Sequence, residues 1–375
     1  MAAISWKANA TDGAARAGVL STPHGDVQTP AFMPVGTRAA VKAVDTDDLK
    51  GVGAEIVLAN TYHLMLRPGA DLIGDLGGLH EFMSWDGPIL TDSGGFQIFS
   101  LEPDIGEDGA TFRSIYDGAL VHLTPEEAVS VQEQLGPDIA MVLDVCVGLP
   151  APRELVDAQM RRTLRWAERC LNAHTRSDQA LFGIVQGGVD LDLRAESARA
   201  TAGLGFEGLA IGGLSVGEPA EERNAALSAA VAELPAEKPR YVMGLGDTDG
   251  LLDAIVRGAD VFDCVIPTRL ARHGRALTST GDFNVNVVQL TDDEAPLEVD
   301  CPCLTCFRYS RAYLRHLVRM KELSAHRLLT IHNLTYTLRL VAGARTAIAE
   351  GRLDRYVDWV RTSRQDGSPL PDAEA

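Results

Sequence analysis

Apolar residues form short consecutive runs along the first 270 positions of the chain. Eight such runs occur, at residues 31–35, 55–60, 88–92, 139–146, 180–186, 208–213, 240–246 and 260–266. Most of them are apolar at successive positions rather than at every second one, which is typical of strands covered on both faces in a parallel sheet. The pattern therefore predicts eight buried strands.

Segments with helical periodicity separate several of these runs. Thr124, followed by a proline and two glutamates, predicts the start of one helix, and residues 153–174 and 220–234 carry further helical patterns. Eight units of strand plus crossover predict an α/β fold, a (β/α)8 barrel. The alternative is an open doubly wound sheet, but no GxGxxG motif follows the first strand.

The chain outside the barrel divides into smaller parts. The pattern of residues 1–30 predicts a β-hairpin that closes one end of the barrel. The barrel itself is predicted to span residues 31–280. Residues 281–362 hold a cysteine cluster and closing helices, and residues 363–375 predict a loose tail. No apolar run reaches 18 residues and the N-terminus lacks a signal pattern, so we expect no membrane segment and a cytoplasmic protein.

Charge is distributed unevenly. The net charge of −18 argues against nucleic acid as a partner, yet residues 301–375 hold twelve Lys and Arg against seven Asp and Glu, while residues 1–300 hold 22 against 45. Arg269 and Arg272 belong to a second basic cluster. These residues form either solvated faces or a local phosphate-contacting surface, and the sequence leaves both interpretations open.

Polar residues mark the ends of the predicted strands, where barrel enzymes place their function. These residues are Asn60, Asp92, Asp144, Gln186, Gly213 and Asp263. Each aspartate could simply cap the following helix. However, burying a carboxylate away from water is costly, so three of them at strand ends indicate a function. Enzymes that break or exchange a glycosidic bond usually use a pair of carboxylates beside the sugar.

Glycine pairs and two large side chains accompany these carboxylates. Phe96 follows a Gly pair and could stack on a planar ligand. Gly213 and Leu214 stand in a second Gly-rich turn, whose backbone N–H groups could bind a base carbonyl. The Met243 side chain could form the bottom of the same pocket, although core packing is the more common role of methionine.

The clearest metal signal is a cysteine cluster. Cys301, Cys303 and Cys306 bring three thiolates together, and His332 lies 26 residues after the last of them. Three cysteines and one histidine complete a tetrahedron, which suits a structural zinc ion. The alternatives are three reduced cysteines without metal, or His316 or His326 as the fourth ligand.

Six motifs together resemble the tRNA-guanine transglycosylase family, in its bacterial, queuosine-pathway branch. They are TDSGGFQ, FGIVQGG, GGLSVGE, MGLG, FDCVIPTR and CPCLTC with its later histidine, and the resemblance covers residues 4–360. It implies exchange of guanine at the wobble position of tRNAs for Asn, Asp, His and Tyr. The incoming base would be the deazaguanine preQ1, and a covalent enzyme–tRNA intermediate and a homodimer are implied as well.

The resemblance also implies roles for individual residues. Asp263 matches the nucleophile and Asp92 the acid and base. The base-binding and tRNA-binding residues match Phe96, Asp144, Gln186, Gly213, Leu214, Glu218, Met243, Arg269 and Arg272, and the zinc ligands match Cys301, Cys303, Cys306 and His332. Val145 departs from the family pattern, since many bacterial members carry Glu there. Phe96 stands where some have Tyr.

Two other functions compete with this one. A catalytically silent tRNA-binding subunit would not need both Asp92 and Asp263, which this chain retains. A glycosidase acting on a sugar polymer would need an aromatic-lined groove, and aromatic residues are only 6% of the chain. Val216, where queuine-using members generally carry Gly, favours preQ1 over the bulkier queuine.

Overall fold

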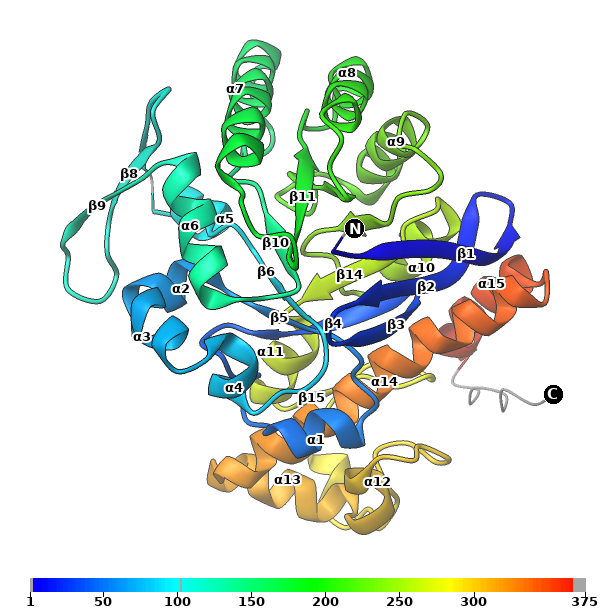
Figure 1. Cartoon of the computed structure of the whole chain (residues 1–375). Helices are drawn as coiled ribbons and strands as arrows, with labels where there is room; N and C mark the ends of the chain where they lie inside the picture. The colour runs from blue at the N-terminus through cyan, green and yellow to red at the C-terminus, as the bar shows by residue number, and fades with distance from the viewer. Residues whose placement is uncertain (1–2, 102, 367–375) are drawn as a thin grey trace.

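Eight parallel strands form a closed barrel in the computed structural model, which describes residues 3–101 and 103–366 (Figure 1). The barrel strands are β4 (Ala31–Gly36), β5 (Val57–Ala59), β6 (Ile89–Thr91), β10 (Ile139–Met141), β11 (Ala180–Val185), β12 (Gly208–Ile211), β13 (Arg240–Val242) and β14 (Val261–Cys264). Seven of them lie within a predicted apolar run, and β4 extends one residue beyond its run. Because β14 pairs with β4, the sheet closes, and the barrel prediction is confirmed over the open alternative.

Helices cover the outside of the barrel. The larger ones between strands are α6 (Pro125–Leu135), α7 (Arg153–Ala173), α8 (Leu191–Gly203), α9 (Ala220–Val231) and α10 (Thr248–Val256). The predicted helix start at Thr124 is confirmed: its side chain accepts a hydrogen bond from the Glu127 N–H, and the Glu127 carboxylate accepts one from the Thr124 N–H. This reciprocal capping box satisfies two otherwise unpaired donors.

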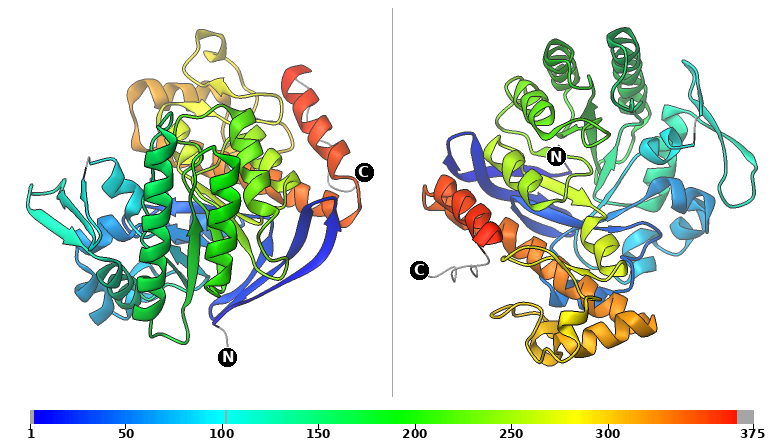
Figure 2. Two further views of the ribbon diagram at one scale, coloured as in Figure 1. Left: turned by 90° about the horizontal axis from the view of Figure 1, so that it is seen from above. Right: turned by 180° about the vertical axis from the view of Figure 1, so that it is seen from behind.

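The segments between the first three barrel strands and β10 are more elaborate than the sequence pattern predicted. Short helices α1 (Thr46–Gly51), α2 (Thr61–Leu66), α3 (Ala70–Asp75), α4 (Gly78–Met83) and α5 (Gly95–Phe99) occupy them. An antiparallel sheet of β7 (Asp104–Ile105), β8 (Ala110–Arg113) and β9 (Leu120–Leu123) follows α5 and projects from the barrel (Figures 1 and 2).

The N-terminal segment forms three strands rather than the two of the predicted hairpin. They are β1 (Ser5–Asp12), β2 (Ala15–Thr22) and β3 (Gly25–Thr29). Arg16 on β2 forms a buried ion pair with Asp260, which directly precedes β14, and His24 contacts Asp138, which directly precedes β10. The sheet therefore closes the N-terminal end of the barrel, as predicted, and leaves the C-terminal ends of the strands for the site.

The C-terminal region combines a small module with helices that complete the barrel. After α11 (Ile266–Arg272) come β15 (Arg275–Ala276), β16 (Phe283–Asn284), the 3-10 helix η1 (Val288–Leu290), α12 (Leu304–Arg308), α13 (Arg311–Met320), α14 (Leu323–Ala349) and α15 (Leu353–Asp366). The start of α14 packs in the module, whereas Leu340 and Ala344 further along belong to the barrel core. One long helix thus joins both cores (Figure 2).

The end of the chain differs from the prediction of a loose tail from residue 363. Helix α15 continues through Asp366, and Ser363 is buried. The helix is held near the N-terminal sheet, since the Leu353 N–H donates to the Asp12 carboxylate over 2.8 Å. The remaining residues of the predicted tail, 367–375, lie outside the described part. No helix in the described ranges is long and apolar enough to cross a membrane.

Candidate active site and metal centre

A cavity of about 480 Å³ opens at the C-terminal ends of the barrel strands. The sequence-predicted residues that line it are Asp92, Phe96, Asp144, Gly213, Leu214, Met243, Asp263 and Arg269. Gln186 is buried against this wall, where it contacts Asp144. Glu218 and Arg272 are not among the lining residues: Glu218 binds the backbone of the loop that carries Leu214, and Arg272 donates to the Thr268 carbonyl within α11.

Asp263, at the end of β14, has its two carboxylate oxygens in different surroundings. Oδ1 accepts hydrogen bonds from the Tyr241 hydroxyl over 2.6 Å and from the Gly244 N–H over 2.8 Å. No hydrogen bond to Oδ2 exists among the described residues. Burial raises the pKa of Asp263, and the bonds from Gly244 and Tyr241 oppose that rise. The result is an oriented carboxylate with one oxygen available for chemistry.

Asp92, at the end of β6, is held by the start of α2. Its Oδ1 accepts from the N–H groups of Thr61 over 2.9 Å and of Gly94 over 3.2 Å, and the Asn60 side chain donates to Oδ2. Asp92 does not cap the helix that follows it, contrary to the capping alternative: the N-cap of α5 is Gly94, without a side-chain hydrogen bond, and Thr61 belongs to the earlier helix α2. Burial raises the pKa of Asp92 to about 7, and the nearby charge of Asp263 adds to the rise. An acid with this pKa can both give and take a proton near neutrality.

Asp144 and Gln186 form a buried polar pair in the cavity wall. The Gln186 amide donates to Asp144 Oδ2 over 2.7 Å, and Ser93 donates to Oδ1 over 3.3 Å. Burial raises the pKa of Asp144 to about 6. The glycines of the two motifs make room for this pair: a Cβ on Gly95 would lie 2.8 Å from Asp144 Oδ1, and one on Gly213 would lie 2.2 Å from Gln186 Oε1.

The loop after β12 is shaped by Glu218. The Glu218 carboxylate accepts hydrogen bonds from the N–H groups of Ser215 and Val216. A trans peptide places its carbonyl opposite its N–H, so the Leu214 carbonyl points away from Glu218. Leu214, Ser215 and Val216 all line the cavity. The Leu214 carbonyl is therefore an acceptor available to a ligand.

Val145, the departure from the family pattern, does not line the main cavity. It is buried, its N–H donates to Thr163 Oγ1 over 3.0 Å, and its side chain lies with Trp166 around a much smaller void behind Asp144. The valine thus stands in place of the family's glutamate at a position behind the cavity wall, outside the cavity itself. Phe96, by contrast, stands at the cavity and is 54% exposed, which leaves a ring face accessible.

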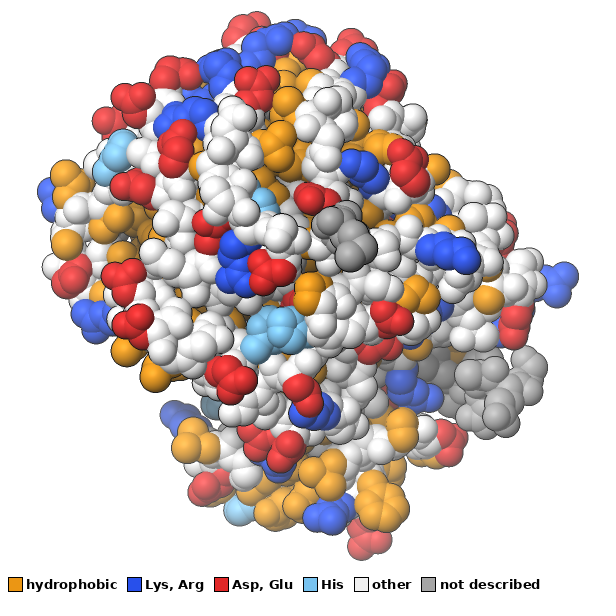
Figure 3. All heavy atoms as spheres, in the orientation of Figure 1, with side chains coloured by type: hydrophobic (Ala, Val, Ile, Leu, Met, Phe, Trp, Pro, Cys, Tyr) orange, Lys and Arg blue, Asp and Glu red, His pale blue; other side chains and the backbone are white. Residues whose placement is uncertain are grey.

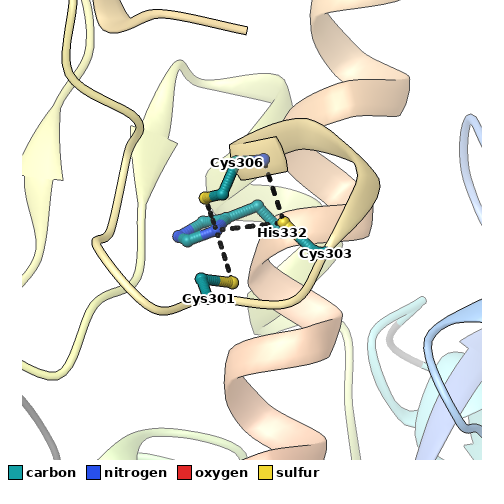
Figure 4. Close-up of side chains that lie close together, drawn as sticks. All are labelled: Cys301, Cys303, Cys306 and His332. Carbon is teal, nitrogen blue, oxygen red and sulfur yellow. Dashed lines mark hydrogen bonds between the residues drawn. The ribbon is translucent and has the colours of Figure 1, made fainter. Parts of the chain in front are cut away.

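Cys301, Cys303, Cys306 and His332 converge as predicted (Figure 4). The three sulfur atoms lie 3.7, 3.7 and 3.3 Å from His332 Nδ1. Tetrahedral zinc, with bonds of about 2.3 Å to sulfur and 2.0 Å to nitrogen, would place sulfur and nitrogen about 3.5 Å apart. His332 Nε2 lies 2.8 Å from the Leu277 carbonyl, which fixes Nε2 as the donor and leaves the Nδ1 lone pair facing the thiols. The residues fit a metal ion, and neither His316 nor His326 belongs to the cluster.

A second group of metal-ligating residue types lies at the closed end of the barrel. His24 Nδ1 and His80 Nε2 lie 2.8 and 3.2 Å from the two oxygens of Asp138, and the imidazoles stack with centroids 3.6 Å apart. Each Asp138 oxygen also accepts a backbone N–H, from His24 and from Ile89. Both Asp138 oxygens therefore already have two hydrogen-bond partners each. We interpret this group as a structural link between the N-terminal sheet and the barrel.

Several arginines of the basic C-terminal region bind other groups of the same chain. Arg311 pairs with Asp293 over 3.1 Å, Arg315 donates to the Val287 carbonyl over 2.7 Å, and Arg327 pairs with the Asp48 carboxylate. Arg269 is different, since it is exposed and lines the cavity. The positive charge at the cavity therefore comes from Arg269 on α11 and from Arg223 on α9, which also lines it.

Sequence comparisons agree with this arrangement. Residues 11–366 match the family described as Queuine tRNA-ribosyltransferase. The chain is 54% identical over 342 residues to a protein of that name from Moorella thermoacetica, with 91% of this chain and 92% of the relative covered. It is 52% identical over 353 residues to one from Herpetosiphon aurantiacus, covering 93% and 90%. It is 50% identical over 379 residues to one from Listeria welshimeri, covering 100% of both chains. The chain belongs to the queuine tRNA-ribosyltransferase family.

Proposed function

We propose that this protein is a tRNA-guanine transglycosylase that replaces guanine at the wobble position of the anticodon with preQ1, a 7-aminomethyl-7-deazaguanine. The observation that carries the proposal is the pairing of Asp263, which has one free oxygen, with Asp92, whose pKa is about 7, in a single cavity. Two carboxylates with different environments suit a nucleophile and a proton-transfer group acting on one glycosidic bond.

The reaction proceeds in two displacements. Asp263 Oδ2 attacks C1′ of the ribose, the bond from C1′ to the base breaks, and guanine leaves with the bonding electron pair. Asp92 in its protonated form donates a proton to the departing base. The incoming base then loses a proton to the Asp92 carboxylate and attacks C1′, which releases Asp263. A covalent intermediate divides one difficult exchange into two easier steps.

Base recognition is assigned to the buried wall of the cavity. Asp144 and Gln186 offer acceptors and a donor to the edge of a purine-like base, and Gly213 offers its backbone N–H. Phe96 and Met243, both at the cavity, would cover the two faces of the ring. Taking a base out of the anticodon loop costs little stacking energy, because that loop is already single-stranded.

The preference for preQ1 over queuine is assigned to the loop after β12. The Leu214 carbonyl is positioned to accept a hydrogen bond from an aminomethyl group, and Val216 fills part of the cavity. Overpacking a rigid pocket typically costs about 1–3 kcal/mol. Val216→Gly should therefore admit queuine while preserving preQ1 exchange, as measured by offering both bases to guanine-containing tRNA at equal concentration. Equal use of queuine by the unaltered protein would contradict this assignment.

The metal is proposed to be one structural zinc ion per chain. Bound zinc would supply a tetrahedral cross-link, with all four positions taken by protein ligands. His332 and its neighbour Asn333 connect the cluster to the basic segment after the barrel: the Asn333 amide donates to the carbonyls of Pro267 and Arg275 over 3.0 Å each. The metal would thus hold α11, with Arg269 and Arg272, in position to bind the anticodon region of tRNA.

A homodimer with its interface near the metal module is part of the proposal. Hydrophobic side chains gather among charged ones over α12 and α13, at the bottom of Figure 3. Phe307 is 83% exposed, Leu323 81% and Met320 55%. Exposed apolar groups of this size are typical of an interaction surface.

Because the proposed substrate is tRNA and the thiolates must stay reduced, we assign the protein to the cytoplasm.

The test is exchange of labelled guanine into unmodified tRNA for Asn, Asp, His or Tyr, with and without competing preQ1. Incorporation of label that preQ1 suppresses is the expected result. Binding of tRNA without any exchange would contradict the proposal and favour a silent tRNA-binding subunit. Asp263→Asn is the matched control, since it keeps the shape of the side chain and removes the nucleophile.

A further inference from the structure

A buried arginine lies behind the base-binding wall. Arg194 on α8 is completely buried, yet no ion pair to it exists among the described residues. Its Nε donates to the Gly188 carbonyl over 2.7 Å, Nη1 to the Val185 carbonyl over 3.0 Å and Nη2 to the Gly213 carbonyl over 3.1 Å. All three partners are main-chain groups: Val185 is the last residue of β11, and Gly188 and Gly213 lie in the turns that follow β11 and β12.

These three carbonyls surround the residues assigned to base recognition. Val185 and Gly188 lie on either side of Gln186 in the chain, so two of the bonds fix the turn that carries the Gln186 amide. The third bond fixes Gly213, which has a left-handed φ of +63° and sits against Gln186. One planar guanidinium therefore locks the two turns at a set distance from each other.

Burying a cation without a carboxylate partner is expensive, which argues against a purely structural role. Burial lowers the pKa of Arg194 to about 10, while the nearby Cys146 and Glu218 side chains raise it, so the group stays charged at neutral pH. Glu218 accepts the N–H groups of Ser215 and Val216, one with each carboxylate oxygen, in the loop that follows Gly213.

We propose that Arg194 is a positioning residue for base specificity, which clamps the Gln186 turn to the Gly213 turn and so fixes the backbone that leads into Leu214. The Leu214 carbonyl thereby stays directed away from Glu218, ready for an aminomethyl group. This inference rests on the proposed function, because it concerns how the same cavity selects its incoming base.

Arg194→Lys tests the clamp. A lysine keeps the charge but cannot reach three carbonyls in a planar fork. We expect the KM for preQ1 to rise about tenfold or more, with a weaker preference for preQ1 over guanine, while the KM for tRNA changes less than twofold. Arg194→Gln, which also removes the charge, should reduce the preference further. Single-turnover and steady-state exchange with both bases provide these values.

Arg240 offers a matched control. It is also buried, its pKa is likewise lowered by burial to about 10, and it donates to the Leu234 carbonyl over 2.9 Å, but it lies at the start of β13, at the closed end of the barrel. Arg240→Lys should lower the Tm without changing the KM for either base.

The outcomes separate this inference from the proposed function. If the unaltered protein exchanges no guanine, the proposed function fails. If it exchanges guanine and Arg194→Lys keeps the normal base KM and preference, only the role of Arg194 is overturned. If both Arg194 variants fail to fold while Arg240→Lys folds, Arg194 belongs to the core and the inference is likewise overturned.

Discussion

Tyr241 determines how Asp263 faces the cavity. Its hydroxyl, buried inside the barrel, donates to the same carboxylate oxygen as the Gly244 N–H. Tyr241→Phe should therefore lower kcat for exchange by roughly 10- to 100-fold, since a hydrogen bond to a charged group contributes about 1.5–3 kcal/mol. The KM for tRNA should hardly change. Single-turnover release of guanine from tRNA measures the effect.

Tyr336→Phe is the control for that variant. Tyr336 is another buried tyrosine, whose hydroxyl lies 3.0 Å from Thr248 Oγ1, and it does not line the cavity. Loss of this hydroxyl should reduce stability without slowing guanine release. Equal slowing by both variants would mean that the Tyr241 effect is a general loss of packing.

The two halves of the reaction should respond to pH in opposite directions. In the proposed mechanism Asp92 must carry a proton to release guanine, so the rate of that step should fall about tenfold per pH unit above its pKa of about 7. The second step needs the Asp92 carboxylate, so its rate should rise with pH, with a midpoint below that of the first step because Asp263 is then an uncharged ester. Rapid-quench measurement of each half between pH 5.5 and 9 checks this. Two flat profiles would remove Asp92 from proton transfer.

At the residue scale, some site residues can be predicted from sequence and others cannot. Asp92, Asp144 and Asp263 stand out because each lies at or near the end of an apolar run, where a carboxylate is unusual. Tyr241 lies within such a run and has the pattern of a core residue. Arg194 lies in a helix, where an arginine usually indicates a solvated face. Only the three-dimensional arrangement distinguishes these two from their neighbours.

The metal module depends on long helix α14. Cys303→Ala should lower metal content and Tm together, because metal binding contributes directly to the stability of such a module. Since His332 and Asn333 connect the cluster to α11, binding of tRNA should weaken as well. Elemental analysis, calorimetry and tRNA titration of one preparation provide the three measurements.

Cys170→Ala is the control for the cysteine change. Cys170 is buried in α7, away from the cluster, and its variant should keep the metal. If chelation stopped exchange at once while Tm and tRNA binding stayed normal, the metal would be catalytic and the structural role would be wrong.

At the element scale, burial decides what the sequence can predict. The eight barrel strands are apolar on both faces, so a consecutive run identifies each of them. Strand β9 has only one buried residue, Leu123, among its four, and β3 is mostly polar, so neither has a clear pattern. Both depend on pairing with a neighbouring strand, which local sequence does not encode.

For the whole molecule, the exposed apolar surface of the module predicts a dimer. Phe307→Asp combined with Leu323→Asp should shift the protein to a monomer, because both side chains are more than four-fifths exposed in the single chain. Analytical ultracentrifugation measures the change. Leu120→Asp on the projecting sheet, where the leucine is 67% exposed, should leave the oligomeric state unchanged. A monomeric unaltered protein would contradict the proposed dimer.

In the proposed mechanism, the barrel, its cap and the cysteine cluster hold Asp263 where it can form a covalent bond to tRNA beside Asp92. The most direct test is to mix the protein with tRNA, denature it, and search for a protein–tRNA adduct on a gel. The account predicts an adduct with the unaltered protein and none with Asp263→Asn, which should still bind tRNA. An adduct that persists in Asp263→Asn would contradict the account and move the nucleophile to another residue, Asp92 first among them.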